Sequence, residues 1–135
     1  MAHFAEINPA DNTVIRVLPM HNYWTDPARG ASEESAASRL KEIYGGNWKQ
    51  TSYNTRGGVH QLGGTPLRAN YCGKGWVYHP LPVDVFSPPQ PFPSWTLDEV
   101  KGQWISPVPM PDDAGPEKRY QWNEDDQQWD EVDMT

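Results

Sequence analysis

The sequence predicts an α+β fold that is mainly β, in which one helix packs on short β-hairpins and an extended, proline-rich C-terminal arm follows. Three observations support this prediction. Only one segment has the apolar spacing of a helix, aromatic residues repeatedly flank short polar turns, and ten of the fourteen prolines lie between Pro80 and Pro116. Because a helix of ordinary length cannot accommodate that density of proline, we expect this part of the chain to be extended.

The apolar content limits the size of the core. The 135 residues include nineteen Ile, Leu and Val, the mean hydropathy is -0.81, and seven Trp, six Tyr and three Phe are present. A buried aromatic side chain removes about 150–250 Å² from water, so these rings can replace missing aliphatic side chains. A chain of this length is enough for one domain. We expect a small mixed α/β core over residues 1–79 and the arm over residues 80–135.

Residues 4–18 are predicted to form the first hairpin. Pro9 presets the backbone for a turn, and Asp11 and Asn12 tolerate the left-handed conformation that closes it. Residues 20–31 follow as a loop that leads into the helix.

The helix is predicted over residues 33–44. Ser32 is a favourable N-cap, acidic residues occupy the first turn, and Gly45 ends the helix. Residues 47–54 have the composition of a strand, whereas residues 56–75 contain six glycines and are predicted to be mostly loop. One apolar face of the helix is expected to pack on the strands through Ala36, Leu40, Ile43 and Tyr44.

Three aromatic pairs flank short polar segments in the second half of the chain: Tyr78 with Phe86, Trp95 with Trp104, and Trp122 with Trp129. In each pair the rings are expected to face one another across a hairpin, an interaction worth about 0.5–1.5 kcal/mol beyond the buried area. Gly102 supplies the positive φ for one turn, while the turn at residues 123–128 relies on Asn and Asp. Together with Trp76 and Tyr120, these aromatic residues are the candidate packing and interface anchors.

Proline-rich segments separate the hairpins. Residues 87–94 and 106–111 are predicted to be polyproline spacers without hydrogen bonds of their own. Two-stranded hairpins are marginally stable in water, so a chain built in this way suits docking on a larger surface and becoming ordered there. We therefore expect a component of an assembly rather than a compact enzyme.

Charge is distributed unevenly along the chain. Residues 1–79 carry eight basic and six acidic side chains, whereas residues 80–135 carry three basic and twelve acidic ones. Because nucleic-acid binding depends on clustered Lys and Arg, we expect no nucleic-acid partner. The sequence has neither an apolar run long enough to cross a membrane nor the basic-then-apolar start of a secretory signal. We expect a soluble protein that is made in a cytoplasm and has no membrane partner.

No pattern in the sequence indicates catalysis or a cofactor. Cys72 lies between His60 and His79, but no motif accompanies them, and a small buried thiol is the expected role of Cys72. The acidic residues lack the alternating spacing of a calcium loop, and the four histidines lack the spacing of a zinc site. The sequence therefore predicts no enzyme activity, no cofactor and no metal ligand. A sugar-stacking platform on the aromatic hairpins is the main competing hypothesis.

Five segments that cover nearly the whole chain resemble a family of small proteins found in tailed bacteriophages, especially phages of marine bacteria. The segments are MAHFAEIN, GNWKQTSYNTRGGVH, GTPLRANYCGKGWVYHP, DVFSPPQPFPSWTLDEVKGQWISPVPMP and YQWNEDDQQWDEV. Residues 20–38 depart from the family pattern, as does Cys72, where a small residue is expected. The resemblance brings no catalytic residues.

The resemblance implies a component of the phage virion that is made in the cytoplasm of the bacterial host. The first hypothesis is a capsid decoration or cement protein that binds the assembled shell and stabilises it. Its partners would be the major capsid protein or other virion proteins, with self-association on the particle as a further contact. The alternative is a tail or fibre component that acts as a carbohydrate-binding host-attachment module. The sequence does not choose between head and tail.

Overall fold

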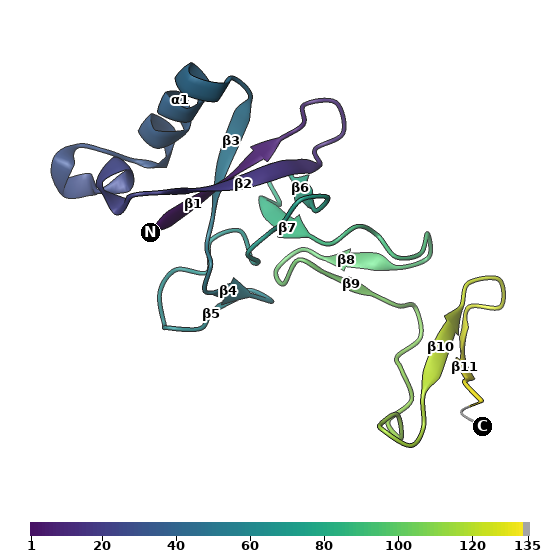
Figure 1. Cartoon of the computed structure of the whole chain (residues 1–135). Helices are drawn as coiled ribbons and strands as arrows, with labels where there is room; N and C mark the ends of the chain where they lie inside the picture. Colours follow the sequence, from purple (N-terminus) through teal and green to yellow (C-terminus); the bar gives the residue numbers. More distant parts are fainter. Residues whose placement is uncertain (134–135) are drawn as a thin grey trace. The chain divides into compact units, whose positions relative to one another are not determined.

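The computed structural model describes residues 1–133 and shows a mainly β chain with one α-helix and several short antiparallel hairpins (Figure 1). The chain forms two compact units. Unit 1 comprises Met1–Pro89 and Glu99–Gln103, and unit 2 comprises Gln90–Asp98 and the chain from Trp104 onwards. Unit 1 therefore extends past residue 80, where the arm was predicted to begin, and it also includes the short segment Glu99–Gln103.

A three-stranded antiparallel sheet forms the centre of unit 1, with the order β2-β1-β3. Its strands are β1 (Ala2–Ile7), β2 (Val14–Met20) and β3 (Asn47–Thr51). The predicted first hairpin is therefore confirmed. In its turn Asn12 has a φ of 62°, as predicted, whereas Asp11 uses its carboxylate to accept hydrogen bonds from the backbone and the hydroxyl of Thr13.

The predicted helix is confirmed as α1 (Glu33–Tyr44). The Ser32 hydroxyl accepts a hydrogen bond from Ser35 N, the Ser35 hydroxyl accepts one from Ser32 N, and Gly45 ends the helix with a φ of 72°. Two 3-10 helices, η1 (Asn22–Thr25) and η2 (Pro27–Arg29), occupy the segment that was predicted to be loop.

The helix packs on one face of the sheet. Because successive side chains of a strand point to opposite faces, Ala2 and Phe4 contact the helix side while Ala5 and Ile7 contact the other side. Ile43 and Tyr44, the other two residues of the predicted apolar face, stay more than half exposed, although the Tyr44 ring contacts Trp48 of β3 with the ring centres 6.1 Å apart. The Tyr44 ring also lies under the guanidinium of Arg16 of β2, 4.9 Å from the ring centre. The helix-side core consists of Ala2, Phe4, Met20, Ala36, Leu40 and Trp48.

Two short hairpins follow β3 in the chain, and residues of the second pack on the opposite face of the sheet. They are β4 (Thr55–Arg56) with β5 (Val59–His60), and β6 (Val77–His79) with β7 (Val85–Ser87). The β6–β7 hairpin pairs Tyr78 with Phe86, and their ring centres lie 5.4 Å apart, which confirms the predicted facing of these two residues. The second core consists of Ala5, Ile7, Val14, Cys72, Tyr78 and Phe86.

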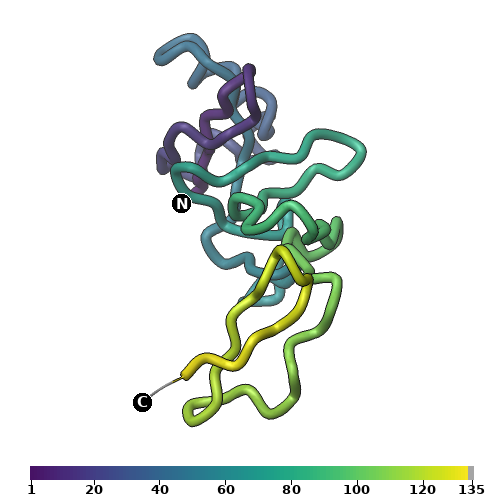
Figure 2. The backbone as a smooth tube through the Cα atoms, turned by 90° about the vertical axis from the view of Figure 1, so that its right-hand side faces the viewer, coloured from purple at the N-terminus to yellow at the C-terminus, as the bar shows by residue number. Residues whose placement is uncertain are grey.

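Unit 2 contains β8 (Thr96–Asp98), most of β9 (Gln103–Ile105), β10 (Tyr120–Asn123) and β11 (Gln128–Glu131). After β9 the chain continues without regular structure, reverses in a tight loop and returns as β10 (Figure 2). The β10–β11 hairpin pairs Trp122 with Trp129, as predicted.

The turn between β10 and β11 differs from the prediction. The residue with positive φ is Gln127, at 48°, rather than an Asn or Asp. Asn123 contributes in another way, because its Oδ1 accepts a hydrogen bond from Asp126 N at 3.0 Å and holds the start of the turn. In this turn Asn123 therefore acts through a side-chain hydrogen bond and not through the tolerance of Asn for the left-handed conformation.

The spacer at residues 87–94 also differs from the prediction, because it takes part in hydrogen bonds. Trp95 N donates to Phe92 O at 3.1 Å, which closes a turn, and the Gln90 amide donates to Trp95 O at 3.0 Å. The extended character of the arm as a whole stays a prediction. Within residues 1–133, no helix combines the length and the apolar character needed to cross a membrane.

Candidate interface and ligand-binding residues

Three tryptophans form the centre of unit 2. The ring centres of Trp122 and Trp129 lie 5.2 Å apart, and Trp95 lies 5.9 Å from each of them, with the rings meeting edge to face. Phe92 extends the group, 5.6 Å from Trp95. Edge-to-face contact brings the positive edge of one ring to the negative face of the next. We call Phe92, Trp95, Trp122 and Trp129 the tryptophan cluster.

Hydrogen bonds fix two of the three indoles. Trp122 Nε1 donates to Glu124 at 2.9 Å, and Trp129 Nε1 donates to Val108 O at 2.7 Å. The Trp95 Nε1 group is buried and has no hydrogen-bond partner within residues 1–133. Because Trp122 is buried and Trp95 and Trp129 are half-buried, these rings serve mainly to pack unit 2.

The other predicted anchors divide between the units. Tyr78 and Phe86 are buried in the second core of unit 1, and half-buried Trp76 packs against the same core. Trp104 and Tyr120 are half-buried in unit 2. The Tyr120 hydroxyl donates to the Asp113 carboxylate at 2.7 Å. The eight residues therefore do not form a single site.

Acidic side chains on unit 2 are held in their charged forms. Hydrogen bonds from the Ser94 hydroxyl and the Trp122 indole lower the pKa of Glu124. Hydrogen bonds from Lys118 and Tyr120 lower the pKa of Asp113 in the same way. The sequence of unit 2 contains ten acidic and two basic residues, so this unit is negative at neutral pH.

Apolar side chains are also exposed on unit 2, along the segment that follows β9. Ile105, Val108 and Met110 are 49%, 43% and 48% exposed, and prolines separate them. We call residues 105–110 the apolar strip. Proline restricts the backbone of this segment, which reduces the entropy lost when a partner binds it.

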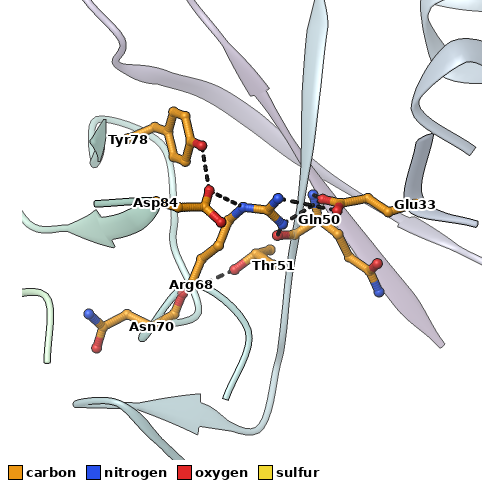
Figure 3. A network of polar contacts seen from close by, with 7 residues as sticks. All are labelled: Glu33, Gln50, Thr51, Arg68, Asn70, Tyr78 and Asp84. Atoms are coloured by element: carbon orange, nitrogen blue, oxygen red, sulfur yellow. Dashed lines mark hydrogen bonds and ion pairs between the residues drawn. The ribbon is translucent and has the colours of Figure 1, made fainter. Parts of the chain in front are cut away.

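A polar network joins the helix, β3 and the β6–β7 hairpin of unit 1 (Figure 3). Arg68 donates through Nε to Asp84 at 2.8 Å, through Nη1 to Gln50 O at 2.9 Å, and through both Nη atoms to the Glu33 carboxylate. The Tyr78 hydroxyl donates to the same Asp84 oxygen. The network therefore links segments that are far apart in the sequence.

Charge pairing keeps the network ionised. Burial acts to lower the pKa of Arg68, but hydrogen bonds and charge from Glu33 and Asp84 raise it overall. Burial acts to raise the pKa of Asp84, and hydrogen bonds from Tyr78 and Arg68 outweigh it and lower the pKa. Burial, together with the neighbouring Asp84, raises the pKa of Tyr78 to about 12. Because each charge has partners, the arrangement is typical of structural support rather than of a reactive group.

Asn70 holds the Glu99–Gln103 turn within unit 1. Its Nδ2 donates to Phe86 O at 2.8 Å, to Lys101 O at 3.0 Å and to Gly102 O at 3.1 Å, while its Oδ1 accepts from Gly57 N. Gly102 has a φ of 61°, as predicted for this turn. A Cβ atom there would lie 2.4 Å from Phe86 O, so only glycine allows this close approach.

The Cys72 thiol is buried, as predicted, and burial raises its pKa to about 11. The two histidines considered with it are engaged elsewhere: His60 Nδ1 accepts hydrogen bonds from Leu62 N and Gly64 N, and His79 Nε2 bonds the Ser87 hydroxyl. Across the described chain no group of three His, Cys, Asp or Glu side chains is arranged to hold a metal ion.

Sequence reasoning missed a cleft in unit 1. Tyr53, Tyr71 and Trp76 line it together with polar side chains from the glycine-rich segment, and its volume is about 380 Å³. Of these three aromatic residues only Trp76 was predicted to be an anchor. The available signal was the tyrosine content of a segment dominated by glycine and polar residues.

Comparison with known proteins identifies no relatives: no family model, no curated protein and no solved structure matches the chain.

Proposed function

We propose that this chain is a structural component of a tailed-phage virion, and specifically a decoration protein that binds the assembled capsid through unit 2. The observation that carries the proposal is the apolar strip on a strongly acidic unit. Exposed apolar side chains bordered by charge are typical of a protein-binding surface. The choice of a phage capsid as the assembly rests on the family resemblance of the sequence.

The chemistry of unit 2 favours a basic partner surface. Its ten acidic and two basic residues would steer it toward clustered Lys or Arg, and the apolar strip would then supply short-range contact. Charge attraction between exposed groups weakens as salt is added. We expect the affinity for assembled shells to fall between low and high ionic strength, and an affinity that is equal at both would contradict this part of the proposal.

Binding of the protein would stabilise the assembled shell by mass action. A ligand that binds only the assembled lattice shifts the equilibrium toward assembly. Particles that lack the protein should therefore assemble but lose their DNA at a lower temperature than complete particles. Quantitative mass spectrometry of purified virions should find many copies, on the head.

A charge substitution in the apolar strip tests the interface directly. Met110→Glu places a carboxylate on the strip and should abolish binding to shells that lack the protein, measured by co-sedimentation. Ile43→Glu is the matched control, because Ile43 is exposed to a similar degree but lies on the helix of unit 1. Equal binding by both variants would rule out the strip as the contact surface.

The alternative function, a tail or fibre component that attaches to the host, predicts a different result. It requires a few copies confined to the tail and heads that are equally stable without the protein. It also places sugar binding on the aromatic hairpins. The packing of the tryptophan cluster, with Trp122 only 5% exposed, favours an internal role for these rings.

A further inference from the structure

The cleft in unit 1 has an aromatic wall. Tyr53 and Tyr71 meet edge to face with ring centres 5.3 Å apart, and the ring of His3 lies 5.9 Å from Tyr53 and 5.5 Å from Tyr71. Trp76 lines the same cleft and is half-buried. Tyr53 is 68% exposed, although it lies in this aromatic group. An exposed aromatic wall of this kind offers flat apolar faces to a ligand.

Uncommitted polar groups also line the cleft. The side chains of Asn54, Arg56 and Gln61 make no hydrogen bond or ion pair with any residue in the described range 1–133. Thr55, which is only 3% exposed, also lines the cleft, and its hydroxyl is buried without a hydrogen-bond partner in that range. Because this oxygen has almost no exposed surface, a ligand in the cleft does not reach it, and the ligand contacts are assigned to the exposed polar groups.

The backbone around the cleft is fixed. Tyr71 N donates to Thr55 O at 2.8 Å, and Gln61 N donates to Asn54 O at 2.7 Å. Asn70, which also lines the cleft, is fully engaged with neighbouring backbone groups. The surrounding structure is therefore set without the polar side chains of Asn54, Arg56 and Gln61, which leaves them available to a ligand. Pre-organisation of this kind reduces the entropy cost of binding.

We propose that this cleft binds a saccharide unit. The carbon-bound hydrogens of a sugar ring pack on aromatic faces, while its hydroxyls exchange hydrogen bonds with amide, guanidinium and hydroxyl groups. A volume of about 380 Å³ lies within the range of small-molecule sites. The only charged side chain that lines the cleft within residues 1–133 is Arg56, which fits a neutral or singly acidic sugar better than a phosphate-rich ligand.

This inference does not depend on the decoration function. The residues involved belong to unit 1, whereas the proposed capsid contact belongs to unit 2. Failure of one proposal leaves the other standing, because shell co-sedimentation tests the first and sugar titration tests the second.

Nuclear magnetic resonance titration of the full chain is the direct test. The probes are maltotetraose, chitotetraose, tetragalacturonic acid and N-acetylneuraminic acid, each up to about 10 mM, a range that detects the millimolar affinities of small ligands. At least one probe should shift the Trp76 indole N–H signal together with backbone signals at residues 53–56 and 61. If none of the four probes shifts these signals, the proposal is overturned.

Variants then locate the site. Tyr53→Ala and Gln61→Ala alter exposed side chains, and each should weaken binding of the active probe by about tenfold or more. Tyr44→Ala is the matched control, because Tyr44 is an exposed tyrosine outside the cleft, and it should bind as the parent does. Unchanged labelling of buried Cys72 in each variant verifies the fold. Parent affinity in both cleft variants would overturn the proposal.

Discussion

Replacement of Arg68 by methionine tests whether the polar network holds unit 1 together. The Arg68 side chain is 8% exposed, and it donates to two carboxylates and to the backbone carbonyl of Gln50. Met has a similar length and keeps the Cβ atom, so the positive φ of 50° at this position is equally strained in both proteins. The substitution therefore removes the charge and the donors without a large change in side-chain volume.

The expected cost follows from the burial of each partner. Breaking a buried ion pair costs about 3–5 kcal/mol, because it leaves a charge without compensation. The carboxylates of Glu33 and Asp84 are 30% and 32% exposed, so water restores part of their solvation. We therefore expect Arg68→Met to lower the free energy of unfolding of unit 1 by about 2–3 kcal/mol. Such a loss is a large fraction of the about 5–15 kcal/mol typical of a domain.

The single cysteine supplies an assay that is specific for unit 1. Cys72 is 2% exposed, and burial raises its pKa to about 11, so a thiol reagent should label it only when unit 1 opens. The midpoint of labelling against urea then reports the stability of this unit.

Arg56→Met is the matched control, because Arg56 is exposed and has no ion-pair partner in the described chain. Substitution there should change stability by less than about 0.5 kcal/mol. If Arg68→Met shifts the labelling midpoint no more than Arg56→Met does, the network does not stabilise unit 1.

Three further predictions concern the turn, the tryptophan cluster and pH. Gly102→Ala should destabilise unit 1 by more than Gly75→Ala does. Both glycines have a positive φ, but only a Cβ atom at residue 102 would meet a backbone oxygen, at 2.4 Å. Equal cysteine labelling in the two variants would contradict the close approach. Trp122→Ala should cost about 3–5 kcal/mol in unit 2, seen as loss of near-ultraviolet circular dichroism; a retained spectrum would exclude a packing role. Burial lowers the pKa of His3 and His79, with the N-terminal charge also acting on His3. The unfolded chain then binds more protons, so stability should fall as pH drops below about 6.5 and through the folded-state pKa values, and His→Gln variants should flatten the dependence.

Local signals account for the elements that the sequence predicts. Ser32 and Gly45 delimit the helix because each acts on the nearest turn of backbone. Trp122 and Trp129 face one another because the turn between them fixes the register of two adjacent strands. In each case the partners lie within a few residues in the sequence.

Long-range contacts explain what the sequence did not predict. Arg68 reaches Glu33, 35 residues away in the chain, and no local pattern indicates that pairing. The cleft is equally non-local, because Tyr53 and Tyr71 meet only after the intervening segment has folded back. Ile43 satisfied the helical spacing of an apolar face, but it is 57% exposed, whereas Ala36 and Leu40 on the same face are buried. The spacing of apolar residues predicts which face of a helix is apolar, but it does not predict how much of that face its neighbours bury.

The connection between the units bears on the proposed decoration function. The chain leaves unit 1 after Pro89, returns for Glu99–Gln103, and leaves again at Trp104, so three peptide connections join the units instead of one. Asn70 anchors the returning turn by bonding the carbonyls of Lys101 and Gly102. A partner bound through unit 2 would therefore be joined to unit 1 by three covalent connections, two of which meet at the turn that Asn70 holds. Such connectivity suits a protein that reinforces a shell under internal pressure better than a single flexible linker would, because the ends of one flexible linker range over a distance that grows with its length.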